Sequence, residues 1–259
     1  MRHRGPDDAG EWWSADGRVG LGHRRLSILE LSPLGHQPML DEARGISISF
    51  NGEIYNHDHL RRELIAEGFV FRSYSDTEVL LASYATWGMD CLNRLNGMFA
   101  FALYDARQQT VFLARDRVGE KPLFYRLEDR TLQFASELKA LLSNPKAPRR
   151  IDAESLDCVL GMGFVPGEHC ILQGYNKLPP AHALSFNLSS GVTNIWRYWS
   201  LPELSPDEIQ DPINETELLD ELEILLENAV GLQLSADVPV GVLLSGGVDS
   251  SLITAMAVR

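Results

Sequence analysis

Residues 245–251 (SGGVDSS) combine glycines and serines where an apolar run passes into a helical pattern. Adjacent glycines let backbone N–H groups turn inward, and the N-terminus of a helix adds a partial positive charge. The hydroxyls of the three serines are further hydrogen-bond donors. The spacing and the lysine of a Walker loop are absent from this segment. The segment therefore predicts a site for phosphate or pyrophosphate rather than for transfer of a γ-phosphate.

Residues 214–244 contain the helix and strand that would position this loop. The capping sequence NETE opens a helix at Asn214. Its apolar residues share one helical face and occupy positions 218, 219, 222, 225, 226, 229 and 230. The apolar run at 238–244 (VPVGVLL) is typical of a strand buried in a parallel sheet. Helix, strand, glycine loop and helix indicate the beginning of a doubly wound α/β domain, with a boundary near 200–214.

Residues 18–136 alternate short apolar runs with turn signals and predict a different domain. We expect a strand at 46–50, a turn at 51–53, helices at 59–68 and 77–88, and hairpins that pair 99–105 with 110–116 and 122–127 with 132–136. Short helices are expected at 137–143 and 152–161, and a further hairpin around 187–191. This order of strands and helices predicts an α+β layered sandwich.

Composition and charge narrow the class of protein. The chain has 36 acidic and 23 basic residues, a net charge of −13 that repels phosphate backbones, so we expect no nucleic-acid partner. No run of apolar residues is long enough to cross a membrane, and the first residues contain no apolar signal segment. Three scattered cysteines, Cys91, Cys158 and Cys170, are too few for a disulfide framework. We expect a cytoplasmic protein with no membrane partner.

Two sets of motifs resemble known families. The segment SGGVDSS is similar to the PP-loop of ATP pyrophosphatases, which cleave ATP between its α and β phosphates. Eight ordered blocks resemble the glutaminase domain of class II asparagine synthetases: HRGPDDAG, LGHRRLSILE, HQPM, NGEIYNH, SDTEVLL, LNGMFAFALYD, ARDRVGEKPLFY and FASELKAL. The resemblance covers nearly the whole chain. It implies an αββα sandwich of the N-terminal-nucleophile type, followed by the beginning of an α/β PP-loop domain.

The resemblance also implies roles for individual residues. Those implied to bind glutamine are Arg25, Leu26, Ile28, Asn51, Gly52, Glu53 and Asp76. Arg25 would bind the glutamine carboxylate, and Glu53 and Asp76 would bind its ammonium group, as a zwitterion requires. Asn51 and Gly52 would form the oxyanion hole. The residues implied to bind ATP and pyrophosphate are Leu243, Ser245, Gly246, Gly247, Asp249, Ser250 and Ser251, with Asp249 also holding Mg²⁺.

Each of these residues has a simpler interpretation when taken alone. Arg25 could be a surface arginine, and NGE at 51–53 most often forms a hairpin turn. Asp76 would most often cap the helix that follows it. Only the joint spacing favours a pocket over these interpretations. Three histidines lack the spacing of metal ligands and are expected to be structural: His3, His23 and His36.

The nucleophile of the resembled family has no counterpart in this sequence. That family begins M-C-G-I and uses the cysteine, whose own α-amine serves as the base, whereas Arg2 follows Met1 here. We therefore expect residues 1–200 to form a glutaminase domain and linker without its N-terminal strand. Residues 214–259 would be the truncated start of a synthetase domain, and this chain alone would be inactive.

For the whole enzyme, the resemblance implies ATP-dependent synthesis of asparagine from aspartate and glutamine. The glutaminase would release ammonia, which would attack a β-aspartyl-AMP intermediate formed with ATP and Mg²⁺. A homodimer is the implied assembly. Three alternatives stay open: a related amidotransferase acting on another carboxylate, an enzyme similar to β-lactam synthetases, and a non-catalytic glutamine-binding module.

Overall fold

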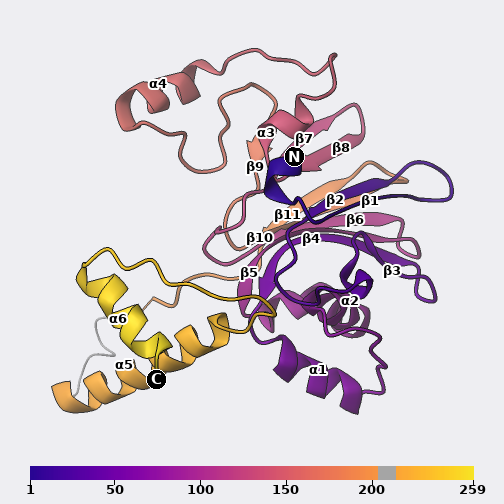
Figure 1. Ribbon diagram of the computed structural model, residues 1–259. Coiled ribbons are helices and arrows are strands. Elements are labelled where there is room, and N and C mark those ends of the chain that lie inside the picture. Colours follow the sequence, from indigo (N-terminus) through magenta and orange to yellow (C-terminus); the bar gives the residue numbers. More distant parts are fainter. Residues whose placement is uncertain (204–213) are drawn as a thin grey trace.

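The computed structural model describes residues 1–203 and 214–259 (Figure 1). The strands are β1 Asp8–Trp13, β2 Gly20–Arg25, β3 Met39–Asp41, β4 Ile46–Ile54, β5 Gly97–Asp105, β6 Thr110–Arg115, β7 Phe124–Glu128, β8 Thr131–Ala135, β9 Asn176–Lys177, β10 His182–Asn187 and β11 Thr193–Arg197. The helices are α1 His57–Ala66, α2 Asp76–Trp87, α3 Leu138–Leu141, α4 Ala153–Met162, α5 Glu215–Gln233 and α6 Val248–Ala257. The helices and hairpins predicted between residues 57 and 197 are confirmed, with shifts of a few residues at their ends.

A six-stranded antiparallel sheet forms the centre of the fold, in the order β11-β10-β6-β5-β4-β3. Helices α1 and α2 cover one of its faces, below the sheet in Figure 1. The even-numbered residues of β4 point into this layer, because side chains alternate along a strand. Ile48 and Phe50 of β4 pack there with Leu64 of α1 and Leu80 of α2, all of them buried.

The opposite face of this sheet packs against two small sheets. One consists of β1 and β2, and the other has the order β8-β7-β9. Leu21 of β2 and Tyr125 of β7 meet Tyr104 of β5 in a shared buried core. Helix α3 lies on the outside of β7 and β8, where Leu141 packs with Phe124. The order helix, sheet, sheet, helix confirms the predicted α+β sandwich.

Residues 51–53 lie inside strand β4, so the predicted turn at NGE is wrong. Asn51, Gly52 and Glu53 continue the ladder with β5, where Gly52 is opposite Phe99. Two glycines make the close approach of the strands possible: an added Cβ would lie 2.1 Å from the Met98 oxygen at Gly52, and 2.2 Å from the Glu53 oxygen at Gly97. Asn51 and Gly52 thus belong to the contact between β4 and β5 and do not form a turn.

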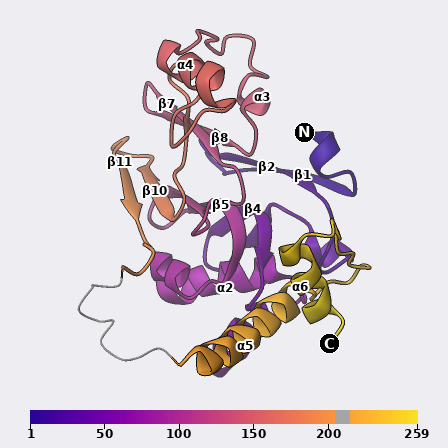
Figure 2. The same cartoon turned by 90° about the vertical axis from the view of Figure 1, so that its left-hand side faces the viewer.

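The predicted strand at 238–244 is also wrong, because these residues form no regular element. A strand of a parallel sheet requires neighbouring strands, and the described residues place none beside this segment. Leu243 is 94% exposed. Helix α5 packs only against α6 within the described part of the second segment (Figure 2). Four leucines on α5, Leu218, Leu219, Leu222 and Leu225, are therefore 50% to 57% exposed.

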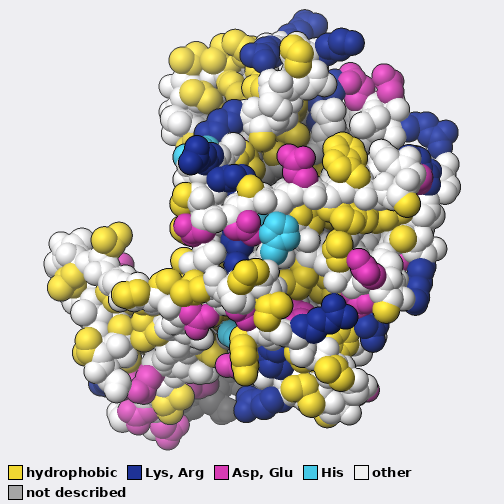
Figure 3. Space-filling view, turned by 45° about the vertical axis from the view of Figure 1, so that its right-hand side comes forward, with side chains coloured by type: hydrophobic (Ala, Val, Ile, Leu, Met, Phe, Trp, Pro, Cys, Tyr) yellow, Lys and Arg dark blue, Asp and Glu magenta, His cyan; other side chains and the backbone are white. Residues whose placement is uncertain are grey.

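The surface carries both kinds of charge. On the face seen in Figure 3, Lys and Arg side chains are spread among acidic ones rather than gathered over one element. Across residues 1–203 and 214–259, no helix has the length and apolar character needed to span a membrane.

Candidate functional site

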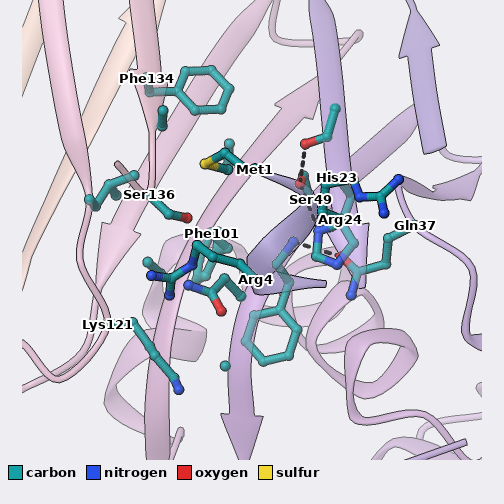
Figure 4. A pocket seen from close by; sticks show the side chains of 18 of the residues that line it. Met1, Arg4, His23, Arg24, Gln37, Ser49, Phe101, Lys121, Phe134 and Ser136 are labelled. Carbon is teal, nitrogen blue, oxygen red and sulfur yellow. Dashed lines mark hydrogen bonds between the residues drawn. The ribbon is translucent and has the colours of Figure 1, made fainter. Parts of the chain in front are cut away.

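A cavity of about 670 Å³ brings together the seven residues that the sequence predicts for glutamine. They are Arg25, Leu26, Ile28, Asn51, Gly52, Glu53 and Asp76. The odd-numbered residues of β4 line its floor, on the face opposite the helices. Figure 4 shows Lys121 on one side of the cavity and Gln37, His23 and Ser49 on the other.

Arg25 ends strand β2 and is only 8% exposed, so its interpretation as a surface arginine is wrong. Its Nη2 donates to the carbonyl oxygens of Leu29 at 2.8 Å and Glu30 at 2.5 Å. Its Nη1 donates to the Ser32 oxygen at 3.4 Å. The guanidinium packs against Gly35, where an added Cβ would lie 2.0 Å from Nη2. The loop that follows β2 therefore fixes the guanidinium, with donors left for a ligand carboxylate.

The two acidic residues reach the cavity from different elements. Asp76 is the first residue of α2, and the N-cap is Ser75 instead, whose Oγ accepts from Thr77 N at 3.1 Å. The Asp76 carboxylate accepts from the backbone N–H of Ile54 at 3.0 Å, which ties the helix to the end of β4. Glu53 projects from β4 into the same cavity. Sheet and helix together thus bring two carboxylates to one end of the site.

The closeness of these carboxylates affects their ionisation. Burial raises the pKa of Glu53 to about 7, with the nearby Asp76 carboxylate raising it further and Lys121 opposing the shift. Burial also raises the pKa of Asp76. Two carboxylates that resist ionising together are stabilised by a cation placed between them. This end of the cavity therefore suits a ligand ammonium group.

We expect the affinity for L-glutamine to rise with pH from about pH 6 to about pH 8. Below the raised pKa of Glu53 its carboxyl group is protonated, so an ammonium group must displace that proton in order to bind. Calorimetry in buffers of different ionisation enthalpy should detect proton release on binding near pH 7. The E53Q variant should bind more weakly and without this proton release, and an unchanged release in E53Q would exclude Glu53 as its source.

Strand β4 also presents backbone donors along one edge. The N–H groups of Phe50, Gly52 and Ile54 point away from β5, because alternate residues of an antiparallel strand bond to opposite sides. Phe50 N donates to Gln37 Oε1 at 2.7 Å, and Ile54 N donates to Asp76. Gly52 lies between them, beyond β3, whose pairing with β4 ends at Ile48. Its N–H is thus left at the cavity between two satisfied neighbours.

Asn51 places a second donor beside this N–H. Across the described residues, its Nδ2 is buried and has no hydrogen-bond partner. Buried polar groups without partners are rare and often mark functional positions. An amide N–H pair of this kind, one from a side chain and one from the backbone, can stabilise negative charge on a carbonyl oxygen.

Replacing Gly52 with alanine is expected to lower the free energy of unfolding by about 3 kcal/mol. The added Cβ would lie 2.1 Å from the Met98 oxygen and 2.7 Å from Phe99 Cα, so β4 and β5 must separate. Urea unfolding measures the change. The matched control is G161A, where the Cβ would meet nothing within 4 Å, and equal stability of the two variants would contradict the prediction.

Sequence reasoning missed Asp116, which orders one wall of the cavity. The side chain is completely buried. Its carboxylate accepts from four backbone N–H groups, those of Phe99 at 3.1 Å, Val118 at 3.2 Å, Glu120 at 2.8 Å and Lys121 at 2.9 Å. It thereby joins β5 to the loop that carries Lys121 towards Glu53. Gln37 was also missed, although both lie in blocks that carry the resemblance.

The described residues bring no cysteine to the cavity. Cys91 is buried in the core beside α2, and Cys170 is buried near α3. Cys158 lies on α4, away from the cavity. Of the three histidines that were expected to be structural, two have carboxylate partners: His36 pairs with Asp8 at 2.7 Å and His3 pairs with Glu137 at 3.0 Å.

The predicted phosphate loop adopts a compact turn before α6. Gly246 has a φ of +82°, and Gly247 is the N-cap of the helix. Ser245 Oγ and Ser250 Oγ lie 3.0 Å apart. Asp249 stands in the first turn of α6, and in the part of the chain that the structure describes no cluster of three metal-ligating side chains occurs. A lone carboxylate fits a Mg²⁺ ion that takes its other ligands from phosphate and water.

Comparison with protein families connects the two parts of the chain to known domains. Residues 1–199 match the family of the glutamine amidotransferase domain. The chain belongs to this family. Residues 221–259 match the asparagine synthase family. The family predicted from the ordered sequence blocks is therefore confirmed.

Several curated proteins are similar to this chain over nearly all of its length. "Asparagine synthetase [glutamine-hydrolyzing] 3" of Bacillus subtilis (strain 168) is 43% identical, over 99% of this chain and 41% of that protein. "Putative asparagine synthetase [glutamine-hydrolyzing] 2" of Methanocaldococcus jannaschii is 36% identical, over 98% of this chain and 51% of that protein. "Amidase chry2" of Gibberella zeae is 37% identical, over 99% and 37%. The chain thus spans about half the length of these relatives or less.

Proposed function

We propose that residues 1–199 bind L-glutamine as an amide donor and that the whole protein transfers this nitrogen to aspartate, giving asparagine at the expense of ATP. One observation carries the proposal: a single cavity holds an ordered arginine, two carboxylates and the unpartnered Nδ2 of Asn51. These groups match the carboxylate, the ammonium and the side-chain carbonyl of glutamine. The names of the Bacillus and Methanocaldococcus relatives support the same activity.

In this proposal each part of the cavity acts on one part of glutamine. Arg25 binds the carboxylate, and Glu53 with Asp76 binds the ammonium group. The side chain then extends towards Asn51 Nδ2 and Gly52 N–H, which polarise the amide carbonyl and stabilise the oxyanion formed by nucleophilic attack. Since no cysteine of the described residues lies at the cavity, these residues bind and polarise glutamine without supplying the thiol.

The loop at 245–251 would hold the pyrophosphate part of ATP. Its backbone N–H groups and serine hydroxyls are suited to phosphate oxygens, at the positive end of α6. Asp249 would hold Mg²⁺, which neutralises charge on the phosphates. Adenylation would give the β-carboxylate of aspartate a good leaving group, and ammonia would displace AMP. Leu243, two residues before Ser245, would also contribute to this ATP-binding segment.

Isothermal titration of the 259-residue chain with L-glutamine tests the proposed amino-acid site. We expect saturable binding of L-glutamine and no release of ammonia. L-Glutamate should bind more weakly, because its side-chain carboxylate brings a further negative charge into a cavity that already holds Glu53 and Asp76. Absence of glutamine binding would overturn the proposal.

A non-catalytic glutamine-binding module is the second candidate, favoured by the absence of a cysteine from the described cavity wall. The whole protein distinguishes the two candidates. Formation of asparagine and AMP from aspartate, glutamine and ATP supports the synthetase, and binding without any product supports the module. The Gibberella relative, named an amidase, makes other carboxylate acceptors part of the same screen.

Two further expectations stay predictions. These are a cytoplasmic location and a homodimer, and light scattering after size-exclusion chromatography would test the second.

A further inference from the structure

A contact between the two matched parts of the chain lies beside the cavity. The backbone N–H of Asp237 donates to the Ile28 oxygen at 2.9 Å, and its Oδ2 accepts from Glu30 N at 2.7 Å. Ile28 lines the cavity, whereas Asp237 belongs to the segment between α5 and the phosphate loop. These two hydrogen bonds therefore connect the second part of the chain to the wall of the amino-acid pocket.

Glu30, which is hydrogen-bonded to Asp237, also accepts a hydrogen bond from Arg25. The Glu30 oxygen accepts from Arg25 Nη2 at 2.5 Å, while the Glu30 N–H donates to Asp237. Glu30 has a φ of +56°, a left-handed conformation that only a few per cent of non-glycine residues adopt. Such a conformation persists where surrounding contacts impose it, and Asp237 makes one of these contacts.

The side chain of Glu30 extends the same connection to the acidic end of the pocket. Its Oε1 accepts from Ser32 Oγ at 2.5 Å, and its Oε2 accepts from Tyr74 N at 2.9 Å. Tyr74 lies two residues before Asp76, in the turn that leads into α2. Glu30 therefore contacts both Arg25 and the segment that leads to Asp76. Asp237 is hydrogen-bonded directly to Glu30.

We propose that Asp237 is a positioning residue of the amino-acid pocket. It holds residues 28–30 in the conformation that aims Arg25 and Asp76 at a single ligand, although it touches neither of them nor the ligand. The inference rests on the proposed glutamine site. It also places a determinant of glutamine affinity in the segment that leads to the phosphate loop, so the amino-acid site depends on both parts of the chain.

Titration of the 259-residue variants with two ligands tests this role. We expect D237A to weaken L-glutamine binding about 5- to 10-fold. L-Glutaminamide keeps the ammonium group but lacks the carboxylate that Arg25 would bind, so D237A should weaken its binding less, through Asp76 alone. D237N, which keeps a carbonyl oxygen as acceptor, should recover most of the loss. D220A, which removes an exposed acidic residue of α5, is the matched control and should bind as the unaltered chain does.

Three outcomes separate the alternatives. An unchanged glutamine affinity in D237A overturns the positioning role. An equal loss for both ligands also overturns it, because a general structural defect does not distinguish the carboxylate. If the unaltered chain binds no glutamine, the proposed function fails. Hydrogen exchange then tests the contact by itself. If Asp237 holds Glu30, D237A should increase the exchange rate of the Tyr74 amide, which donates to Glu30. An unchanged exchange rate of Tyr74 would contradict the role of Asp237.

Discussion

Replacing Arg25 with lysine is expected to weaken the binding of L-glutamine about 100-fold. The guanidinium has enough donors to bond the oxygens of Leu29 and Glu30 while still facing a ligand carboxylate. A lysine ammonium has three donors at a single point and cannot replace this planar arrangement. The variant loses a charge-assisted hydrogen bond to the ligand and the order of the loop beside it.

The matched experiment compares ligands as well as variants. L-Glutaminamide should bind the unaltered chain weakly, and R25K should reduce its affinity far less than it reduces that of L-glutamine. R44K is the control, because Arg44 is exposed and pairs with Asp41 outside the cavity. If R25K and R44K bind glutamine equally well, Arg25 does not bind the carboxylate and the proposed orientation of the ligand is wrong.

Replacing Asp116 with alanine is expected to lower the free energy of unfolding by about 4 kcal/mol. Four backbone N–H groups donate to this one buried carboxylate, and alanine would leave them without partners in the protein interior. Hydrogen bonds to a charged group are among the stronger ones, and unsatisfied buried donors add a desolvation cost. Urea unfolding of both proteins measures the difference.

Two further variants show whether the carboxylate itself is responsible. D116N keeps one carbonyl oxygen but turns an NH₂ group towards backbone donors, so its stability should lie between those of D116A and the unaltered chain. D157A removes an exposed carboxylate from α4 and should change stability little. A loss of less than about 1 kcal/mol in D116A would mean that water satisfies these N–H groups after the substitution.

The parts of the fold that depend on local pattern were predictable. Helix α2 lies between the Ser75 cap and Gly88, and β5 and β6 are apolar runs joined by a short polar turn, so the sequence indicates them directly. The turn expected at Asn51 and Gly52 was wrong, because β5 supplies a partner strand that no local pattern shows. The strand expected at 238–244 was wrong for the converse reason, since no partner strand lies beside it in the described structure.

The same distinction applies to the site. The motifs indicated which residues would meet, and the structure places all seven at one cavity. The motifs could not show that Ser75 rather than Asp76 caps α2, which leaves the Asp76 carboxylate for Ile54. Nor could they show Asp116 and Glu30 as supports, because several of their hydrogen-bond partners come from segments that only the fold brings together.

Strand β4 performs two tasks with its two faces. Ile48 and Phe50 fill the layer beneath α1 and α2, while Asn51 and Glu53 face the cavity. Sliding the strand by a single position would exchange these sets and destroy both. The side chains that β4 presents to the cavity are therefore fixed by the packing of its other face against α1 and α2. A substitution in the apolar layer that shifts β4 would therefore also move the side chains that line the cavity.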